Sequence, residues 1–362
     1  MMTKLSKTTW KNLPDDPDHV VPLIKKFVRE RKGTWDKVIC LGMGGSALGI
    51  VTLQKALFPF DDRLTVLDNL DSISVNHQLS ILNPSRTLVL VISKSGTTLE
   101  TMTLLEIFKK KFSKKDYQKN FIAITDPNEG RLRKIADRDG LTSFSIPSEV
   151  GGRFSVLSAV GLLPLALLGG SPEKLLKGAK HADNKFAKKL AQKTFDLYQQ
   201  GVIINAMMIY SDHLYPFSLW YQQLLAESIG KSRTVGITPL ALRGTSDQHS
   251  VLQLLQDGPN DKFTIFLSVT FPPATCPPWR KGGQGGVHKI LNLECQATEQ
   301  ALREDGRPTT KITIDKISEE SLGMLFMLFQ MQVIRLGELF HVNAFDQPGV
   351  EKSKEIVKKL LS

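Results

Sequence analysis

Strand-like and helix-like segments alternate along the first half of the chain, and this alternation constrains the fold more than any other feature. The expected strands are short apolar runs at 38–41, 64–67, 87–93 and 121–125. The expected helices cover 47–57, 74–82, 98–112 and the stretch around 131–136. Such alternation favours a doubly wound parallel sheet, whose ligands bind at the carboxyl ends of the strands. The loops after Leu41 and Ser93 are therefore the first places to look for a site.

The alternation restarts in the second half, after an apolar stretch at 155–174 that predicts a helix stopping at Gly169 and Gly170. The elements expected there are a charged helix at 184–198, a strand at 202–210, a helix at 219–228, strands at 262–269 and 311–315, and a long helix at 319–340. At 362 residues the chain is long enough for two domains. We place the first at 1–170 and the second at 171–362, and we expect the Pro- and Gly-rich stretch 271–288 to be a loop.

The composition, 41% hydrophobic and 23% charged, is that of a soluble globular protein. Three scattered cysteines suit neither a disulfide framework nor a zinc site, which favours a reducing cytoplasm. No apolar segment predicts export or a membrane span, because the longest one, around 156–168, is interrupted. The net charge of +11 is spread along amphipathic stretches without interleaved aromatics, which favours a solvated basic surface over a nucleic-acid footprint.

The stretch VICLGMGGSALG at 38–49 admits two interpretations. Gly42, Gly44 and Ala47 fit the dinucleotide fingerprint G-x-G-x-x-G/A, and Asp68 lies roughly where such folds place a ribose-binding acid. Alternatively, Ser46 and the glycines before it hold a substrate phosphate at a helix N-terminus, with no cofactor.

A second loop, SKSGTT at 93–98, separates a strand-like run from a helix. Its hydroxyls, lysine and glycine favour a phosphate cradle, since a plain N-cap needs only one Ser or Thr. A dinucleotide fold needs no second loop of this kind, whereas a sugar phosphate would use both. Together with GMGGS, the loop resembles the sugar-isomerase (SIS) domain, a flavodoxin-like α/β fold that binds phosphosugars through Ser/Thr-rich loops.

Four further segments carry candidate catalytic residues, and each has a structural alternative. Arg153 in VGGRFS is suited to stabilise developing negative charge, or else makes a surface salt bridge. Gln223 and Glu227 share one helix face, where Glu227 is a general base or a solvated carboxylate. His249 is a proton shuttle or a structural histidine. Lys354 acts in catalysis only if the FDQPG turn folds back onto a site; otherwise it is a helix-surface charge.

The order of these segments along the chain is distinctive. GMGGS, SKSGTT, VGGRFS, QxxxE, GTSDQH and FDQPGVExxK strongly resemble the glucose-6-phosphate isomerase family, from about residue 38 to 354. VGGRFSVLSAVG and GELFHVNAFDQPGVEKSK look like the signature sequences of that family. The resemblance implies an α/β protein of two flavodoxin-like, three-layer αβα SIS domains with mainly parallel sheets.

The resemblance also implies a role for each matching residue. Glu227 is the catalytic base, Arg153 stabilises the enediol intermediate, and His249 and Lys354 assist the opening and closing of the sugar ring. The implied substrate-binding residues are Gly45, Ser46, Ser93, Lys94, Ser95, Thr98, Gln223 and Gln347. In this family the histidine comes from the partner subunit, so a homodimer with a shared active site is implied.

The implied reaction is the reversible isomerisation of glucose 6-phosphate and fructose 6-phosphate, as used in glycolysis and gluconeogenesis. After ring opening, C2 is acidic beside the C1 carbonyl, so Glu227 can remove its proton and Arg153 can stabilise the cis-enediolate. No cofactor, metal, nucleic acid or membrane is expected to take part. Two alternatives stay open at this point: a phosphosugar-sensing module without catalysis, and a nicotinamide dehydrogenase.

Overall fold

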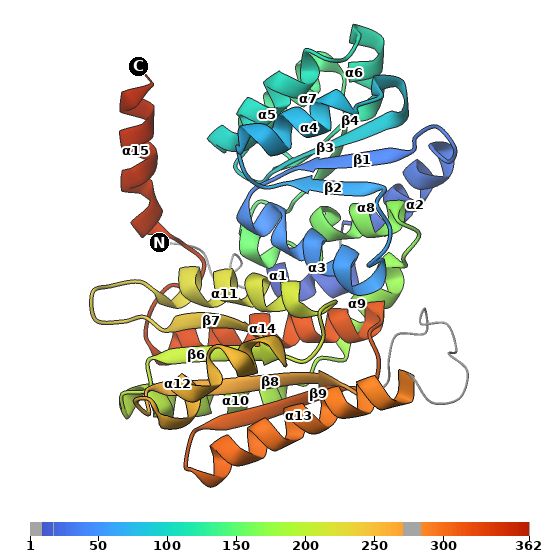
Figure 1. Cartoon of the computed structure of the whole chain (residues 1–362). Helices are drawn as coiled ribbons and strands as arrows, with labels where there is room; N and C mark the ends of the chain where they lie inside the picture. The colour runs from blue at the N-terminus through green and yellow to red at the C-terminus, as the bar shows by residue number, and fades with distance from the viewer. Residues whose placement is uncertain (1–8, 17, 271–283, 362) are drawn as a thin grey trace. The chain divides into compact units, whose positions relative to one another are not determined.

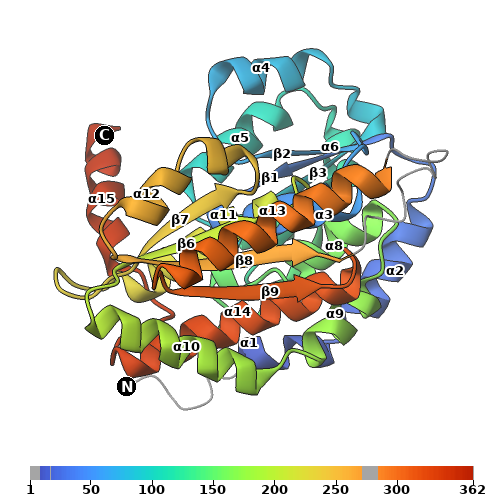
Figure 2. The same cartoon turned by 60° about the horizontal axis from the view of Figure 1, so that its bottom comes forward.

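The computed structural model describes residues 9–16, 18–270 and 284–361. The chain divides into two compact units, residues 1–181 with 318–326, and residues 182–317 with 327–362. Each unit holds one parallel sheet flanked by helices, as Figures 1 and 2 show. The expected α/β class with parallel sheets is confirmed.

Five strands form the sheet of the first unit, in the order β2-β1-β3-β4-β5. They are β1 (Lys37–Leu41), β2 (Leu64–Leu67), β3 (Thr87–Ser93), β4 (Phe121–Thr125) and β5 (Thr142–Ser145). Every residue of β3 and β4 is buried, which explains why these strands are continuous apolar runs. The strand order is flavodoxin-like and places the topological switch point between β1 and β3.

Helices cover both faces of this sheet. They are α1 (Thr9–Asn12), α2 (Val20–Glu30), α3 (Leu48–Leu57), α4 (Ser72–Ser80), α5 (Leu99–Lys109), α6 (Lys114–Asn120), α7 (Arg131–Asp139), α8 (Ala159–Leu167) and α9 (Pro172–Lys180). Figure 1 shows α4 to α7 over one face and α2, α3 and α8 over the other. Side chains of α5, α6 and α7 pack on β1, β3 and β4 in a continuous apolar core.

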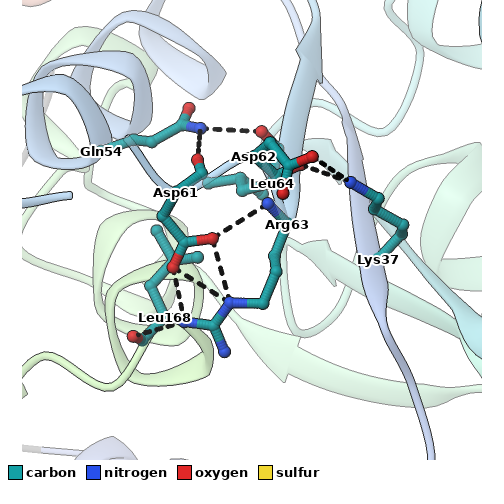
Figure 3. Close-up of polar contacts among 7 residues, drawn as sticks. All are labelled: Lys37, Gln54, Asp61, Asp62, Arg63, Leu64 and Leu168. Carbon is teal, nitrogen blue, oxygen red and sulfur yellow. Dashed lines mark hydrogen bonds and ion pairs between the residues drawn. The ribbon is translucent and has the colours of Figure 1, made fainter. Parts of the chain in front are cut away.

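A polar network fixes the start of β2 to two helices (Figure 3). Arg63 donates from Nη2 to Asp61 at 2.5 Å and to the Leu168 carbonyl, just after α8, at 3.0 Å. Gln54 of α3 donates to the Leu64 carbonyl at 2.7 Å. The Arg63 guanidinium holds the pKa of the Asp61 carboxyl below its usual value. The edge strand β2 is thereby anchored to α3 through its own backbone and to the end of α8 through Arg63, the residue before it.

The helix expected in the stretch 155–174, with its stop at Gly169 and Gly170, is α8, which begins four residues later than the stretch, at Ala159. Residues 155–158 form turns before α8, and Gly169, with φ +96°, ends α8 as expected of a glycine stop. Ser171 then caps α9, accepting from the Lys174 amide at 3.2 Å. Residues 171–181 lie in the first unit.

Four parallel strands form the sheet of the second unit, in the order β7-β6-β8-β9. They are β6 (Ile204–Ile209), β7 (Thr238–Arg243), β8 (Lys262–Val269) and β9 (Thr309–Ile314). The helices are α10 (Asn184–Gln199), α11 (Tyr215–Ile229), α12 (Leu252–Asp257), α13 (Gln284–Glu304), α14 (Glu319–Leu339) and α15 (Glu351–Leu360). Figure 2 shows α13 across one face of this sheet and α10 and α14 beneath the other.

The loop expected at 271–288 is wrong for its last five residues, since α13 begins at Gln284. Residues 271–283 lie outside the described part of the chain. Among the described helices, α14 alone is long and apolar enough to cross a membrane by length and composition, and 67% of its most apolar window is buried. That burial is typical of a core helix.

Candidate active site

The two hydroxyl-rich loops of the first unit follow neighbouring strands. Leu41 at the end of β1 lies opposite Val91 of β3, so both loops leave the carboxyl edge beside the switch point. The first loop forms a 3₁₀ turn, η3 (Gly44–Ser46), in which Gly44 has φ +52° and Ser46 is buried. This is the edge at which an open α/β sheet binds its ligand.

The turn η3 touches a second turn, η5 (Gly152–Phe154), through the backbone. A Cβ at Gly45 would lie 2.3 Å from the carbonyl carbon of Gly152 and 2.5 Å from the amide of Arg153. Only glycine allows this approach. The structure therefore brings together the turns that carry Ser46 and Arg153.

Arg153 itself is 3% exposed, and its guanidinium lies 5.5 Å from the centre of the Phe154 ring. Guanidinium groups keep their proton even when buried. The first unit thus holds a fixed positive charge next to η3. An exposed surface position, the structural alternative for Arg153, is wrong.

The loop at 93–98 is ordered by its own side chains. Ser93 and Thr98 share a hydroxyl hydrogen bond of 2.9 Å, and Ser95 accepts from the Thr97 amide at 3.3 Å. Gly96 has φ +64° and its carbonyl accepts from Leu132 at 3.0 Å. In the described structure the side chain of Thr98, the N-cap residue, does not cap α5, so the first amides of this helix can donate to another acceptor.

Asp126, directly after β4, was not singled out from the sequence. Its carboxylate is 8% exposed and lies 3.7 Å from the Lys94 ammonium. Burial opposes ionisation, but the amides of Asn128 and Glu129, the Ser148 hydroxyl and Lys94 outweigh it and lower the pKa of Asp126. Asp126 could have been singled out from the sequence, because it directly follows a buried strand at the carboxyl edge of the sheet.

In the second unit, Gln223 donates to the Glu227 carboxylate at 3.0 Å, one turn apart on α11. The expected shared helix face is confirmed. Leu224 and Leu225 beside them are fully buried. The amide oxygen of Gln223 is buried and accepts no hydrogen bond from the described residues. A buried acceptor of this kind suits a ligand hydroxyl group.

His249 closes a 3₁₀ turn, η6 (Ser246–His249), ahead of α12. The turn follows a γ-turn at Thr245, with φ +60° and a hydrogen bond of 2.9 Å from the Ser246 amide to the Gly244 carbonyl. This conformation is rare and strained for a β-branched residue. Gln248, between Tyr210 and Thr298, fixes the turn, while the His249 side chain is exposed.

Glu227 and His249 lie at opposite edges of their sheet. The chain leaves α11 to enter β7 at Thr238, opposite the first residue of β6, so Glu227 belongs to the amino edge. His249 follows Arg243 at the carboxyl edge. The six residues of β7 span about 20 Å, so these two side chains of one chain cannot contact one substrate carbon together.

The C-terminal segment places Gln347 and Lys354 on the surface. Gln347 is exposed and precedes η7 (Pro348–Val350), the expected turn. Lys354, 60% exposed, pairs with Glu351 at 2.7 Å. All residues of α15 are exposed, and the structure does not bring Lys354 to Glu227.

Comparison with known proteins decides the family. The family model described as phosphoglucose isomerase matches residues 26–266 and 292–362. The chain belongs to the phosphoglucose isomerase family. The match includes every candidate residue named above.

Two members of the family illustrate how far the similarity extends. A glucose-6-phosphate isomerase of Thermus thermophilus is 35% identical over 98% of this chain and 90% of its own length. That of Rubrobacter xylanophilus is 36% identical over 95% of this chain and 87% of its own length. The chain therefore corresponds to nearly a whole phosphoglucose isomerase.

Solved structures agree with this assignment. A hypothetical protein from Thermus thermophilus superposes with a TM-score of 0.88 and 34% identity, covering 100% of this chain and 92% of its own. The tagatose-6-phosphate ketose/aldose isomerase of Escherichia coli, 13% identical, superposes with a TM-score of 0.61 over 95% of this chain and 93% of its own, and so shares the fold. The SIS-type architecture of the phosphoglucose isomerase family is thus confirmed.

Proposed function

We propose that the protein interconverts glucose 6-phosphate and fructose 6-phosphate by proton transfer between C2 and C1. The observation that carries this proposal is the Gln223–Glu227 pair of α11, in a chain that belongs to the phosphoglucose isomerase family. The Gln223 amide orients the carboxylate, and the buried Gln223 oxygen can accept from a substrate hydroxyl. Proton abstraction next to a carbonyl needs a base held in this way.

In the proposed mechanism, Glu227 takes the C2 proton of the open-chain aldose and returns it to C1. The electron pair of the C2–H bond forms the C1=C2 double bond and the carbonyl π electrons move to O1, which gives the cis-enediolate, whose charge Arg153 stabilises. The O2 proton passes to O1, and the O2 electrons form the ketose carbonyl as Glu227 returns its proton to C1. The buried position of Arg153 supports this role, since water screens a buried charge weakly.

The substrate phosphate is proposed to bind at the two loops of the first unit. Gly45, Ser46, Ser93, Lys94, Ser95 and Thr98 are its proposed ligands. The uncapped first turn of α5 and the hydroxyl pair Ser93–Thr98 support this assignment. Asp126 would hold Lys94 in place beside the anion.

We further propose a homodimer in the cytoplasm, in which His249 of one chain opens the sugar ring at the Glu227 of the other. The opposite edges occupied by these residues support this arrangement, because one chain cannot supply both groups to one site. Gln347 is proposed to contact the substrate and Lys354 to assist ring opening. The buried, unpaired thiols of Cys40 and Cys295 support a reducing compartment. The domain boundary after residue 170 stays a prediction.

The test is the variant Glu227→Gln, which keeps the shape and loses the base. We expect kcat to fall by about 10³-fold while the affinity for glucitol 6-phosphate, which has no carbonyl, changes less than about threefold. Asp196→Asn is the matched control, because Asp196 accepts from Gln192 at 2.8 Å in the same one-turn geometry on α10. Full activity of Glu227→Gln would refute the proposed base.

A further inference from the structure

Lys231, two residues beyond the end of α11, has an unusually buried ammonium group. Its side chain is 8% exposed. Its Nζ donates to the backbone carbonyl of Glu227 at 2.6 Å and to the backbone carbonyl of Asp346, and it lies 3.1 Å from the Asp346 carboxylate. An ammonium has three donors, and here two backbone carbonyls and a carboxylate surround it. The lysine therefore joins two segments that are far apart in the sequence.

The first of these segments is the end of α11. The carbonyl of Glu227 is one of the last four of the helix, which have no partner within it. Lys231 satisfies the carbonyl of the residue whose side chain is the proposed base. Any movement of Nζ therefore moves the backbone from which the Glu227 carboxylate extends.

The second segment precedes Gln347 and is fixed at its other end to α14. The Val342 amide donates to the Gly337 carbonyl at 2.9 Å, and a Cβ at Gly337 would lie 2.9 Å from that of Ala344. Asn343 donates to the Asp346 carboxylate at 2.8 Å. With Lys231 at its far end, this segment is held at both ends.

The backbone of Lys231 is fixed in turn. Its amide donates to the Val235 carbonyl at 3.2 Å, and the Ser232 hydroxyl accepts from the Val235 amide at 3.1 Å. Tyr198 of α10 donates to the Thr234 carbonyl at 2.9 Å. The ammonium is thus a rigid connection rather than a mobile surface charge.

We propose that Lys231 is a positioning residue that sets the proposed base Glu227 relative to the substrate-contacting segment at Gln347. The proposal rests on the proposed function, since it assumes that Glu227 abstracts the proton. A lysine that merely closes a helix end would need one carbonyl. This one is buried, donates to two backbone carbonyls, pairs with the Asp346 carboxylate and connects both segments of the second unit that carry proposed site residues on its amino edge.

The test compares Lys231→Met with Lys262→Met in the full chain. Lys262 is the matched control: its side chain is also 8% exposed, pairs with an aspartate, Asp261, and donates to a backbone carbonyl, that of Pro259, at 3.1 Å. We expect Lys231→Met to lower kcat on the order of 10²-fold, the cost of a misplacement of about 1 Å. We expect Lys262→Met to leave kcat within about threefold, and Lys231→Arg to recover part of the loss.

Two readouts separate positioning from loss of folded protein. Glucitol 6-phosphate should bind Lys231→Met with unchanged stoichiometry and an affinity within about threefold of wild type. The primary isotope effect of glucose 6-phosphate deuterated at C2 should be at least as large as in wild type, because proton abstraction becomes slower. A smaller folded fraction would instead lower the binding stoichiometry.

The inference is overturned if kcat of Lys231→Met stays within about threefold of wild type, or if its loss is matched by an equal loss of binding stoichiometry. Glu227→Gln is measured in parallel. An inactive Glu227→Gln beside a normal Lys231→Met refutes the positioning role alone. A fully active Glu227→Gln refutes the proposed base, whatever Lys231→Met does.

Discussion

The absence of a Cβ atom at Gly45 allows the turns η3 and η5 to pack backbone to backbone. Gly45 and Gly152 both belong to the contact, but an added Cβ at Gly45 collides with backbone, whereas one at Gly152 meets nothing within 4 Å. Gly45 is thus required by packing, while Gly152 is not. The two positions make a matched pair for testing whether the contact holds Ser46 and Arg153 for substrate.

We expect Gly45→Ala to lower the free energy of unfolding by about 1–3 kcal/mol, because backbone must move to make room. The displaced turns should also lower kcat/KM at least tenfold. Gly152→Ala should change both quantities little. Urea unfolding and steady-state kinetics measure these effects, and equal behaviour of the two variants would contradict the packing argument.

Individual site residues differed in how far the sequence could predict them. Gln223 and Glu227 meet as predicted, because helix periodicity alone sets their spacing. Asp126 and Lys231 were not predicted. The position of Asp126 directly after a buried strand was a usable signal, but its contact with Lys94 was not. The role of Lys231 depends on contact with Asp346, which is distant in the chain and which local pattern does not encode.

At the scale of elements, one carboxylate joins three helices. Asp139 ends α7 and lies 3.0 Å from Lys109 of α5 and 2.8 Å from the Tyr117 hydroxyl of α6. A negative charge at a helix C-terminus is unfavourable by itself. Hydrogen bonds from Arg138, Lys109 and Tyr117 overcome burial and hold the pKa of Asp139 far below its usual range.

Asp139→Asn should therefore lower the free energy of unfolding by about 1–3 kcal/mol at pH 7. Since the folded-state pKa is depressed, the contribution is complete above about pH 4 and is lost as the pH falls toward the folded value. Urea unfolding at pH 7 and at pH 3 measures this change. Asp137→Asn on the same helix is the control, because Asp137 is 65% exposed. If the difference in the free energy of unfolding between wild type and Asp139→Asn were larger at pH 3 than at pH 7, the proposed role of the Asp139 carboxylate would be contradicted.

Elements were predicted best where burial makes the pattern plain. The strands β2, β3 and β4 have the bounds read from the sequence, since they are short apolar runs between polar turns. β7 was missed because Pro239 argues against a strand, yet β7 is an edge strand, where a missing amide is tolerated. The helix α13 was not predicted, and its first residues were assigned to a loop because of the glycines there.

For the whole molecule, the opposite positions of Glu227 and His249 predict complementation. Measured alone, Glu227→Gln and His249→Ala should each have an activity at least tenfold below that of wild type. Randomly mixed after unfolding and refolding together, they should regain about a quarter of wild-type activity, since half of the dimers are mixed and one of their two sites is intact. A mixture no more active than the average of its parents would contradict a shared site.

The placement of these two groups has a genetic consequence. In the proposed homodimer, the second sheet of each chain carries Glu227 for its own catalytic centre at one edge and His249 for the partner's centre at the other. A chain whose second sheet is distorted would inactivate both catalytic centres of every mixed dimer. Coexpressed with an equal amount of wild type, such a variant is dominant: activity falls below the half expected from gene dosage.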